Sequence, residues 1–189
     1  MFRKLFITLG CGLIILGLFG IAKASLMPIK AIIGQHYLEV AWKDSLKSNK
    51  LSKPWKSADF YMIGELIVPN LKISRVILNS VSGEALAWSI GRVTNLVSLS
   101  KNEPIILAGH RDSHMQFMSK LKIGDKIELM MTDGVLKTYE ISQLEVTDKP
   151  ELKLLSNSIN SDSLILTTCW PFQSIKNGQK RYLIFADIL

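Results

Sequence analysis

The sequence predicts a mainly β domain, folded as a closed or nearly closed barrel with short helices and preceded by an N-terminal transmembrane helix. Residues 5–22 form a long apolar stretch without a single charge. From residue 60 onward, short apolar or β-branched runs alternate with turn signals, which is typical of a barrel. The 189 residues suffice for an anchor and one domain with its own core, but not comfortably for two domains.

The apolar stretch reads LFITLGCGLIILGLFGIA and follows Arg3 and Lys4. At about 1.5 Å per residue it can just cross a hydrocarbon core of about 30 Å. Ala22-Lys23-Ala24 resembles the cleavage site of a secretory signal. However, the apolar run exceeds the usual signal length of about 7–15 residues, and a lysine within the triplet is unfavourable. We therefore expect an uncleaved anchor over residues 1–24.

The next segment, residues 25–57, is predicted to be an amphipathic juxtamembrane helix followed by a linker. Pro28 can open the helix, because proline is favoured at the first helical position. Apolar residues then recur at helical spacing, which predicts a face packed on the domain or on the membrane surface. The polar run 45–57 contains a proline and is typical of a linker. The barrel domain is expected to occupy residues 58–189.

Seven strands are predicted in the domain, each bounded by turn residues. They cover residues 61–68, 73–78, 104–108, 126–131, 135–146, 163–168 and 181–188. Asp133-Gly134 is a strong hairpin signal between the fourth and fifth of these strands. Residues 84–92 are expected to form a short helix or turn, and residues 113–121 a helix.

Charge and cysteine usage limit the classes of function. The net charge of +7 comes from scattered lysines without a dense basic run, which favours a surface near an anionic membrane over a nucleic-acid partner. Cys11 lies in the predicted span and Cys169 near the C-terminus, so the two are poor disulfide partners. Because export favours disulfide pairing, an unpaired thiol in an exported domain indicates a chemical reason for staying free.

Cys169 closes an apolar, β-branched run, and Pro171 ends the strand two residues later. A buried core thiol is the alternative, since free cysteine is among the most buried residue types. A nucleophilic thiol needs thiolate character, and a nearby cation supplies it.

His110 and Arg181 are the groups that could act with this thiol. His110 follows a predicted strand and Gly109, a position suited to acid–base chemistry. Arg181 opens the last strand and could donate to an oxyanion, although an ordinary surface arginine is the alternative.

Asp112 could orient His110 or cap the helix that follows it. His110 and His114 have the HxxxH spacing of some zinc sites, with Cys169 as a conceivable third ligand. No glutamate follows the first histidine, and the context is a loop. We therefore expect neither a metal ion nor a cofactor.

These segments together resemble the sortases, membrane-anchored cysteine transpeptidases of bacterial envelopes. The run 165–169 (ILTTC) resembles their TLxTC motif, with Ile165 in place of the first threonine. Gly109-His110-Arg111 resembles their histidine segment, and Arg181, twelve positions after the cysteine, their essential arginine. The run 65–73 (ELIVPNLKI) resembles their first strand pair. The variants AGHRD and TCWPF are most similar to sortases of Gram-negative, often marine, proteobacteria.

The resemblance implies a barrel of about eight strands at residues 58–189. It implies that Cys169 attacks a C-terminal LPxTG-like sorting signal of a protein substrate, that His110 transfers protons, and that Arg181 steadies the oxyanion or the peptide. Thr167 and Thr168 are the expected substrate contacts. The protein would then pass to an amine acceptor in the cell envelope. With the anchor, this places the chain in the bacterial inner membrane, single-pass, with its domain on the periplasmic side.

Two alternatives stay open at this stage. A thiol hydrolase would cleave the same signal and release the protein to water. A non-catalytic, membrane-tethered barrel would only bind envelope peptides. The L,D-transpeptidases are disfavoured, because they place a glycine before the cysteine, where this chain has Thr168. The loops 81–97 and 151–160 are expected to build the substrate pocket.

Overall fold

A computed structural model describes residues 2–48, 50–94, 104–150, 162–174 and 178–189 of the chain. The chain divides into two compact units, residues 1–36 and residues 37–189. The first unit is helical, and the second contains all of the described strands. The expected pocket loop 151–160 and the end of the loop 81–97 lie outside the described residues.

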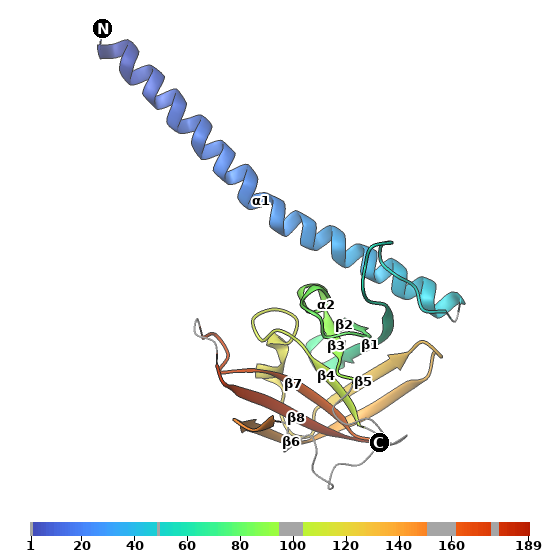
Figure 1. The fold of residues 1–189 in the computed structure, drawn as a ribbon. Coiled ribbons are helices and arrows are strands. Elements are labelled where there is room, and N and C mark those ends of the chain that lie inside the picture. The colour runs from blue at the N-terminus through green and yellow to red at the C-terminus, as the bar shows by residue number, and fades with distance from the viewer. Residues whose placement is uncertain (1, 49, 95–103, 151–161, 175–177) are drawn as a thin grey trace. The chain divides into compact units, whose positions relative to one another are not determined.

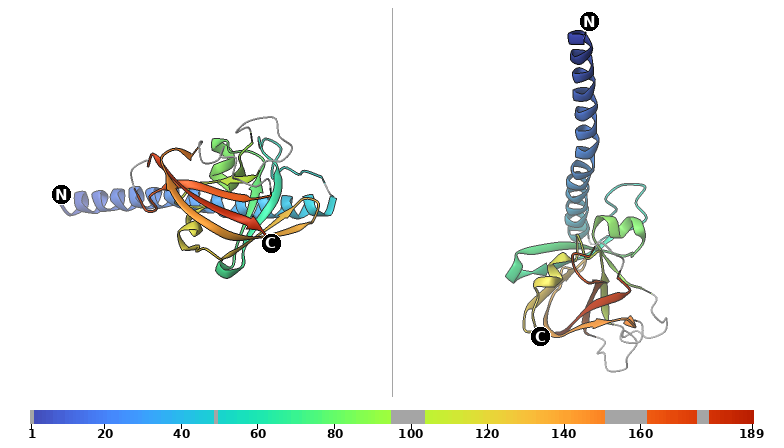
Figure 2. Two further views of the ribbon diagram at one scale, coloured as in Figure 1. Left: turned by 90° about the horizontal axis from the view of Figure 1, so that it is seen from below. Right: turned by 90° about the vertical axis from the view of Figure 1, so that its left-hand side faces the viewer.

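The second unit is a closed barrel of eight strands, which confirms the predicted barrel (Figures 1 and 2). Its strands are β1 (Met62–Val68), β2 (Ile73–Leu78), β3 (Ile90–Arg92), β4 (Ile105–Ala108), β5 (Lys126–Met131), β6 (Leu136–Thr147), β7 (Leu164–Trp170) and β8 (Lys180–Ile188). The helices are α1 (Phe2–Ser48), η1 (Pro69–Leu71), α2 (Gly83–Trp88) and η2 (Gln116–Lys120). Around the barrel the strands follow the order β1-β2-β3-β4-β7-β8-β6-β5.

Most neighbouring strands are antiparallel, but β2/β3 and β4/β7 are parallel. A parallel pair needs a crossover connection, and α2 lies in the connection from β2 to β3. The expectation of a helix or turn over residues 84–92 is corrected in its last part, because Ile90–Arg92 is strand β3. The helix expected over residues 113–121 is only the short 3₁₀ helix η2.

The hairpin between β5 and β6 forms at the predicted place. Gly134 has φ 77°, a left-handed conformation that glycine adopts without steric cost. Its N–H donates to the Met131 carbonyl at 2.9 Å. The Asp133 carboxylate accepts from the Val135 N–H at 2.9 Å and closes the turn.

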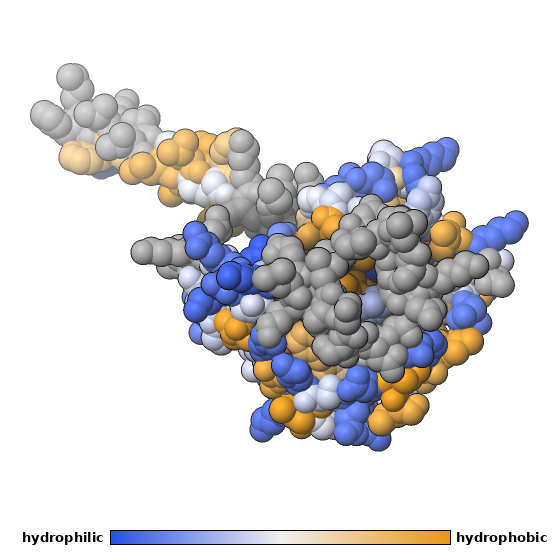
Figure 3. All heavy atoms as spheres, turned by 60° about the horizontal axis from the view of Figure 1, so that its bottom comes forward, coloured by the Kyte–Doolittle hydropathy of each residue, from blue (hydrophilic) through white to orange (hydrophobic). Residues whose placement is uncertain are grey.

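Alternate residues of the strands point into the barrel and form its core. Leu66, Ile77, Leu107, Leu166 and Ile184 belong to one buried cluster on this inner face. Figure 3 shows hydrophilic and hydrophobic residues interspersed over the barrel surface.

A second buried cluster joins the end of α1 to the outside of the barrel. Leu38, Ala41 and Trp42 pack with Phe60 and Leu78 in this cluster. The Trp42 Nε1–H also donates to a carboxylate oxygen of Glu65 on β1, at 2.9 Å. The last turns of α1 are therefore part of the folded domain.

The boundaries of α1 differ from the sequence expectation. Pro28, expected to open a helix, lies inside α1, which runs from Phe2 to Ser48. The first residues of the expected linker are helical. Ser45 among them is buried, and its hydroxyl donates to the Ala41 carbonyl and accepts from the Ser52 N–H.

Within the described residues, no helix offers a stretch both apolar and long enough for a membrane span. The transmembrane helix predicted over residues 1–24 is not confirmed, and part of that segment lies outside the described side chains.

Gly91→Ala is expected to destabilise the barrel by about 3 kcal/mol, because overpacking at a close backbone contact cannot relax cheaply. A Cβ at Gly91 would lie 2.0 Å from the Ser80 carbonyl oxygen. Denaturant unfolding of the full chain measures the loss. Gly83→Ala is the matched control, since no atom lies within 4 Å of its added Cβ. Equal stability of the two variants would contradict the close packing of β3.

Candidate active site

Cys169 lies one residue before the end of β7 and is half-buried. Side chains alternate between the two faces of a strand. Leu164 and Leu166 belong to the inner core, so Thr168 shares their inward direction. Cys169 and Thr167 consequently face the opposite, outer side of β7.

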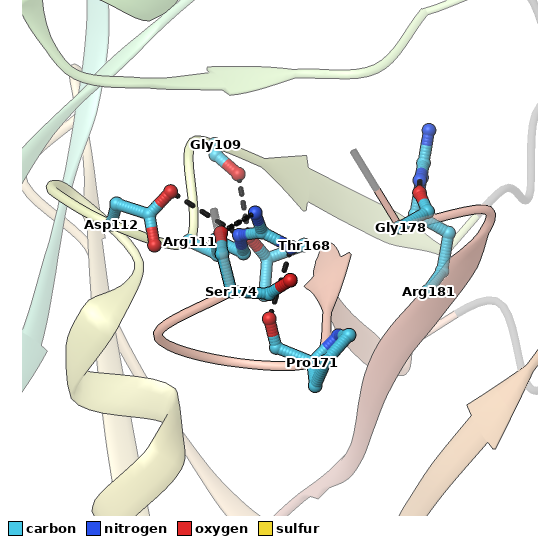
Figure 4. Close-up of polar contacts among 8 residues, drawn as sticks. All are labelled: Gly109, Arg111, Asp112, Thr168, Pro171, Ser174, Gly178 and Arg181. Atoms are coloured by element: carbon cyan, nitrogen blue, oxygen red, sulfur yellow. Dashed lines mark hydrogen bonds and ion pairs between the residues drawn. The ribbon is translucent and has the colours of Figure 1, made fainter. Parts of the chain in front are cut away.

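Arg181 lies directly opposite Cys169 in the antiparallel pair of β7 and β8. Opposed residues of such a pair project from the same face, with their Cβ atoms about 4.5–5.5 Å apart. The Arg181 Nη1 atom lies 3.4 Å from the carbonyl oxygens of both Gly178 and Lys180. Figure 4 shows its side chain on β8 with the guanidinium near Gly178, apart from the other contacts drawn. The fold therefore places a permanent positive charge on the same side of the sheet as the thiol.

His110 follows β4 by two residues, and β4 is the other neighbour of β7. The parallel register pairs Ala108 with Thr167, and Cys169 likewise lies two residues beyond that pair. Neighbouring strands are about 4.8 Å apart, so His110 and Cys169 lie at the same level along the two strands. The chain turns sharply after His110, whose carbonyl accepts from the Met115 N–H at 3.0 Å. The His110 side chain is exposed at this turn.

Thr168 links the ends of β4 and β7. Its hydroxyl donates to the Gly109 carbonyl at 2.7 Å, and the residue is only 3% exposed. This burial leaves its side chain almost no surface to offer a substrate. Gly109 has its own constraint, because a Cβ there would lie 2.8 Å from the Met115 side chain. Thr167 is half-buried on the same side as Cys169.

Arg111 is the residue of this region to which sequence reasoning gave no role of its own. Its side chain is buried, and its guanidinium donates to the carbonyls of Pro171, at 2.9 Å, and Ser174. Its Nε lies 3.2 Å from the Asp112 carboxylate (Figure 4). The available signal is a charged residue directly after a histidine that follows a buried strand, because such a charge must find partners if it is buried.

Asp112 is paired with Arg111 and its side chain is 64% exposed. The alternative that it caps the following helix is wrong, because the N-cap of η2 is Met115 and no side chain donates or accepts there.

His114 lies close to the site on the side of β2 and α2. Its Nε2 is 3.2 Å from the Ala87 carbonyl oxygen. Burial is the main cause that lowers the pKa of His114, and the positive charges of Arg75 and His110 lower it further, against a rise from the bond to Ala87. The Arg75 Nε is itself buried without a hydrogen-bond partner among the described residues. In the part of the chain that the structure describes, no three His, Cys, Asp or Glu side chains cluster as a metal site.

The site is thus built at one end of the barrel from three adjacent strands. β4 ends before His110, β7 carries Cys169 and β8 carries Arg181. A thiol, an imidazole and a guanidinium at the ends of adjacent strands are the groups that acyl transfer through a thioester uses.

Comparison with known proteins assigns this fold to a family. The sortase domain model matches residues 66–189, more than half of the chain. The chain therefore belongs to the sortase family, a family of cysteine transpeptidases. It is 28% identical to sortase D of Bacillus subtilis over 144 residues, which cover 76% of this chain and 72% of that protein.

Solved structures agree with this assignment. The catalytic domain of B. anthracis SrtD is 27% identical, with a TM-score of 0.53 over 68% of this chain and 87% of that chain. Sortase A from Corynebacterium diphtheriae has the same fold at 20% identity, with a TM-score of 0.60 over 70% of this chain and 63% of that chain. The affinity to sortases of Gram-negative proteobacteria is not shown by these relatives and stays a prediction.

His114→Gln is expected to reduce the loss of stability in acid. Because the pKa of His114 in the fold lies below its ordinary value of about 6.5, the unfolded chain binds more protons in this window. Stability therefore falls as the pH drops through about 6.5, until the folded form also becomes protonated. Thermal unfolding of the full chain at pH 7.5 and pH 5.5 measures this: the variant should lose fewer degrees than the wild type. Equal losses would contradict a depressed pKa.

Proposed function

We propose that this chain cleaves a C-terminal LPxTG-like sorting signal and transfers the protein to an amine acceptor. Membership of the sortase family supports a transpeptidase. The observation that carries the proposal is the register that sets Arg181 opposite Cys169, with the end of β4 on the other side of β7. The solved sortase C of Clostridium perfringens, 20% identical, contains the C-terminal cell wall sorting motif, and we extend such a substrate to this chain.

In the first half-reaction, the Cys169 thiolate attacks the carbonyl carbon of the scissile peptide bond. A carbon–sulfur bond forms, and the carbonyl oxygen becomes an oxyanion. When the oxyanion collapses, the carbon–nitrogen bond breaks and protonated His110 gives its proton to the leaving amine. The products are a thioester on Cys169 and the released C-terminal fragment.

In the second half-reaction, the acceptor amine attacks the thioester carbonyl. Neutral His110 takes the proton from the attacking nitrogen, a new carbon–nitrogen bond forms, and the sulfur leaves as a thiolate. The protein substrate is now joined to the acceptor through an amide. The enzyme returns to its starting charge state, so no cofactor is consumed.

Arg181 is assigned to the oxyanion or to the sorting peptide beside it. Its guanidinium cannot lose its charge, and its position across from the cysteine suits a carbonyl attacked by that sulfur. Of the two threonines expected to contact the substrate, Thr167 is the one that lies on the same side of β7 as Cys169 and has surface to offer a peptide.

Hydrolysis is the competing outcome at the same site. His110 is exposed, so water can reach the base that would otherwise serve the acceptor amine. A transpeptidase must let the amine react before water does.

We also propose that the N-terminal segment anchors the chain in the inner membrane, with the barrel on the periplasmic side. Residues 5–22 contain no charge. Leu13, Ile14, Leu16 and Phe19 are all at least 60% exposed on α1, and hydrophobic residues line much of this helix in Figure 3. A membrane would cover these side chains and would confine enzyme and tethered substrate to two dimensions.

The Cys169→Ala and His110→Ala variants are expected to show no measurable turnover of LPxTG-like peptides that carry a fluorophore and a quencher. Arg181→Ala should lose about 10²–10³-fold in kcat, the range for removal of one oxyanion donor. Mass spectrometry with and without an added amine then separates ligated from hydrolysed product. His114→Ala and Cys11→Ala are the controls and should stay within about 2-fold of wild type. Undiminished turnover by Cys169→Ala would refute the mechanism, and hydrolysed product alone would identify a hydrolase.

Leu16→Arg combined with Phe19→Arg is expected to release the chain from the membrane fraction, because each arginine costs about 2.5–3.5 kcal/mol at the centre of a span. Fractionation of cells with an alkaline carbonate wash measures the release. Ile123→Arg is the matched control, because this exposed isoleucine lies in the barrel domain. A wild-type chain that the wash removes would disprove the anchor.

A further inference from the structure

Two links hold the ends of β4 and β7 together beyond their last paired residues. The first is the bond from the Thr168 hydroxyl to the Gly109 carbonyl. The second is the fork of Arg111, which bonds to the carbonyls of Pro171 and Ser174. His110 lies between Gly109 and Arg111, and Cys169 lies between Thr168 and Pro171. Each of these two residues therefore has one link directly before it in the chain and one link after it.

Figure 4 shows the second link in detail. The Arg111 side chain reaches from the segment after β4 to the loop that follows β7. Only 7% of it is exposed, and all three of its nitrogen groups have a described acceptor. Each of its nitrogens thus already bonds within the fold, and the buried side chain offers a substrate almost no surface. Any effect of Arg111 on the reaction must therefore come from the two chain segments that it holds together.

Both segments lie beyond the last paired residues of β4 and β7. β7 ends at Trp170 and β8 begins at Lys180, so Pro171 and Ser174 lie outside the strand ladder. After His110 the chain turns away from β4. A planar, permanently charged fork can hold two carbonyls at once, whereas an ammonium acts as a single point.

We propose that Arg111 is a positioning residue that sets the separation of His110 and Cys169 by clamping the segment after each. This inference rests on the proposed function. Without the fork, the direct tie between the segment after His110 and the segment after Cys169 is lost, although Phe172 still packs on Trp170 and Tyr182 and the His110 carbonyl still accepts from the Met115 N–H. The imidazole and the sulfur then sample separations at which proton transfer is slow. A misplacement of about 1 Å in such an arrangement is enough for losses near 10²-fold.

Arg111→Met and Arg111→Lys test the clamp in the full chain with Cys11→Ser, so that Cys169 is the single thiol. We expect Arg111→Met to lower kcat for the sorting peptide by about 10–100-fold, with KM within about 3-fold of wild type. Arg111→Lys should give an intermediate loss, because it keeps the charge but holds one carbonyl at a time. Active-site titration corrects each rate for the folded fraction. Lys126→Gln, an exposed lysine on β5, is the control for loss of charge and should match wild type.

A second measurement needs no peptide substrate. The rate of Cys169 alkylation by iodoacetamide is followed against pH in wild type, His110→Ala and both Arg111 variants. We expect the Arg111 variants to shift the profile in the same direction as His110→Ala, since both loosen the coupling of imidazole and thiol.

The outcomes separate the two proposals. A wild-type chain that transfers and cleaves no peptide, but whose alkylation profile responds to Arg111→Lys as to His110→Ala, would refute the proposed function and support the clamp. A folded Arg111→Lys chain with wild-type kcat and a wild-type profile would overturn the clamp. So would a loss of activity that disappears after correction for the folded fraction. If Arg111→Met does not fold, the result for Arg111→Lys alone tests the clamp.

Discussion

The parallel pairing of β4 with β7 is the constraint on which the site depends. Its register, Ala108 beside Thr167, brings the residues before His110 and Cys169 to one level although about sixty positions separate them in the chain. The antiparallel pairing of β7 with β8 then sets Arg181 across from Cys169. A slip of one residue in either pair would turn the cysteine toward the opposite face or separate it from its partner. The inward leucines of β7 prevent that slip, because their burial in the core fixes which residues face outward. Packing inside the barrel thus determines chemistry on its outside.

Much of this arrangement could be predicted from the sequence, because strands and turns leave local signals. The strand runs, the Asp133-Gly134 hairpin and the strand-end positions of His110, Cys169 and Arg181 follow from alternation and from turn residues. β3 was missed because it has only three residues and is held by two register pairs with each neighbour, so its strand character comes from the barrel. The order of the strands could not be derived either, since a parallel pair separated by two other strands leaves no local trace. The family resemblance predicted a barrel of about eight strands but not the order of its strands.

The polar contacts of the site were the least predictable part. Thr167 and Thr168 are identical in type and adjacent, yet one faces the thiol's side and the other lies inside the barrel bonded to Gly109. Which of the two threonines points inward can be told only once it is known which face of β7 packs into the core. Asp112 was expected to orient His110 or to cap a helix; the structure shows it paired with Arg111 and not at a helix cap. A buried guanidinium attracts the nearest carboxylate, so the role of Asp112 could not be assigned before the burial of Arg111 was known.

A site built at the strand ends of a barrel imposes a conflict that Arg111 resolves. Strand ends must stay open for a peptide, but open ends leave backbone carbonyls without ladder partners, and buried unpaired carbonyls are costly. Extending the ladder would satisfy them and close the site. A buried arginine satisfies carbonyls of Pro171 and Ser174 from one side and leaves the outer face of β7 free. The free-energy cost of burying the Arg111 charge is offset by its bonds to the two carbonyls and by its ion pair with Asp112, whose side chain is largely exposed to solvent. The same contacts that complete the backbone's hydrogen bonding also tie the loop after the thiol to the loop after the imidazole. Arg111 thus serves both the hydrogen bonding of these loops and the geometry of the site.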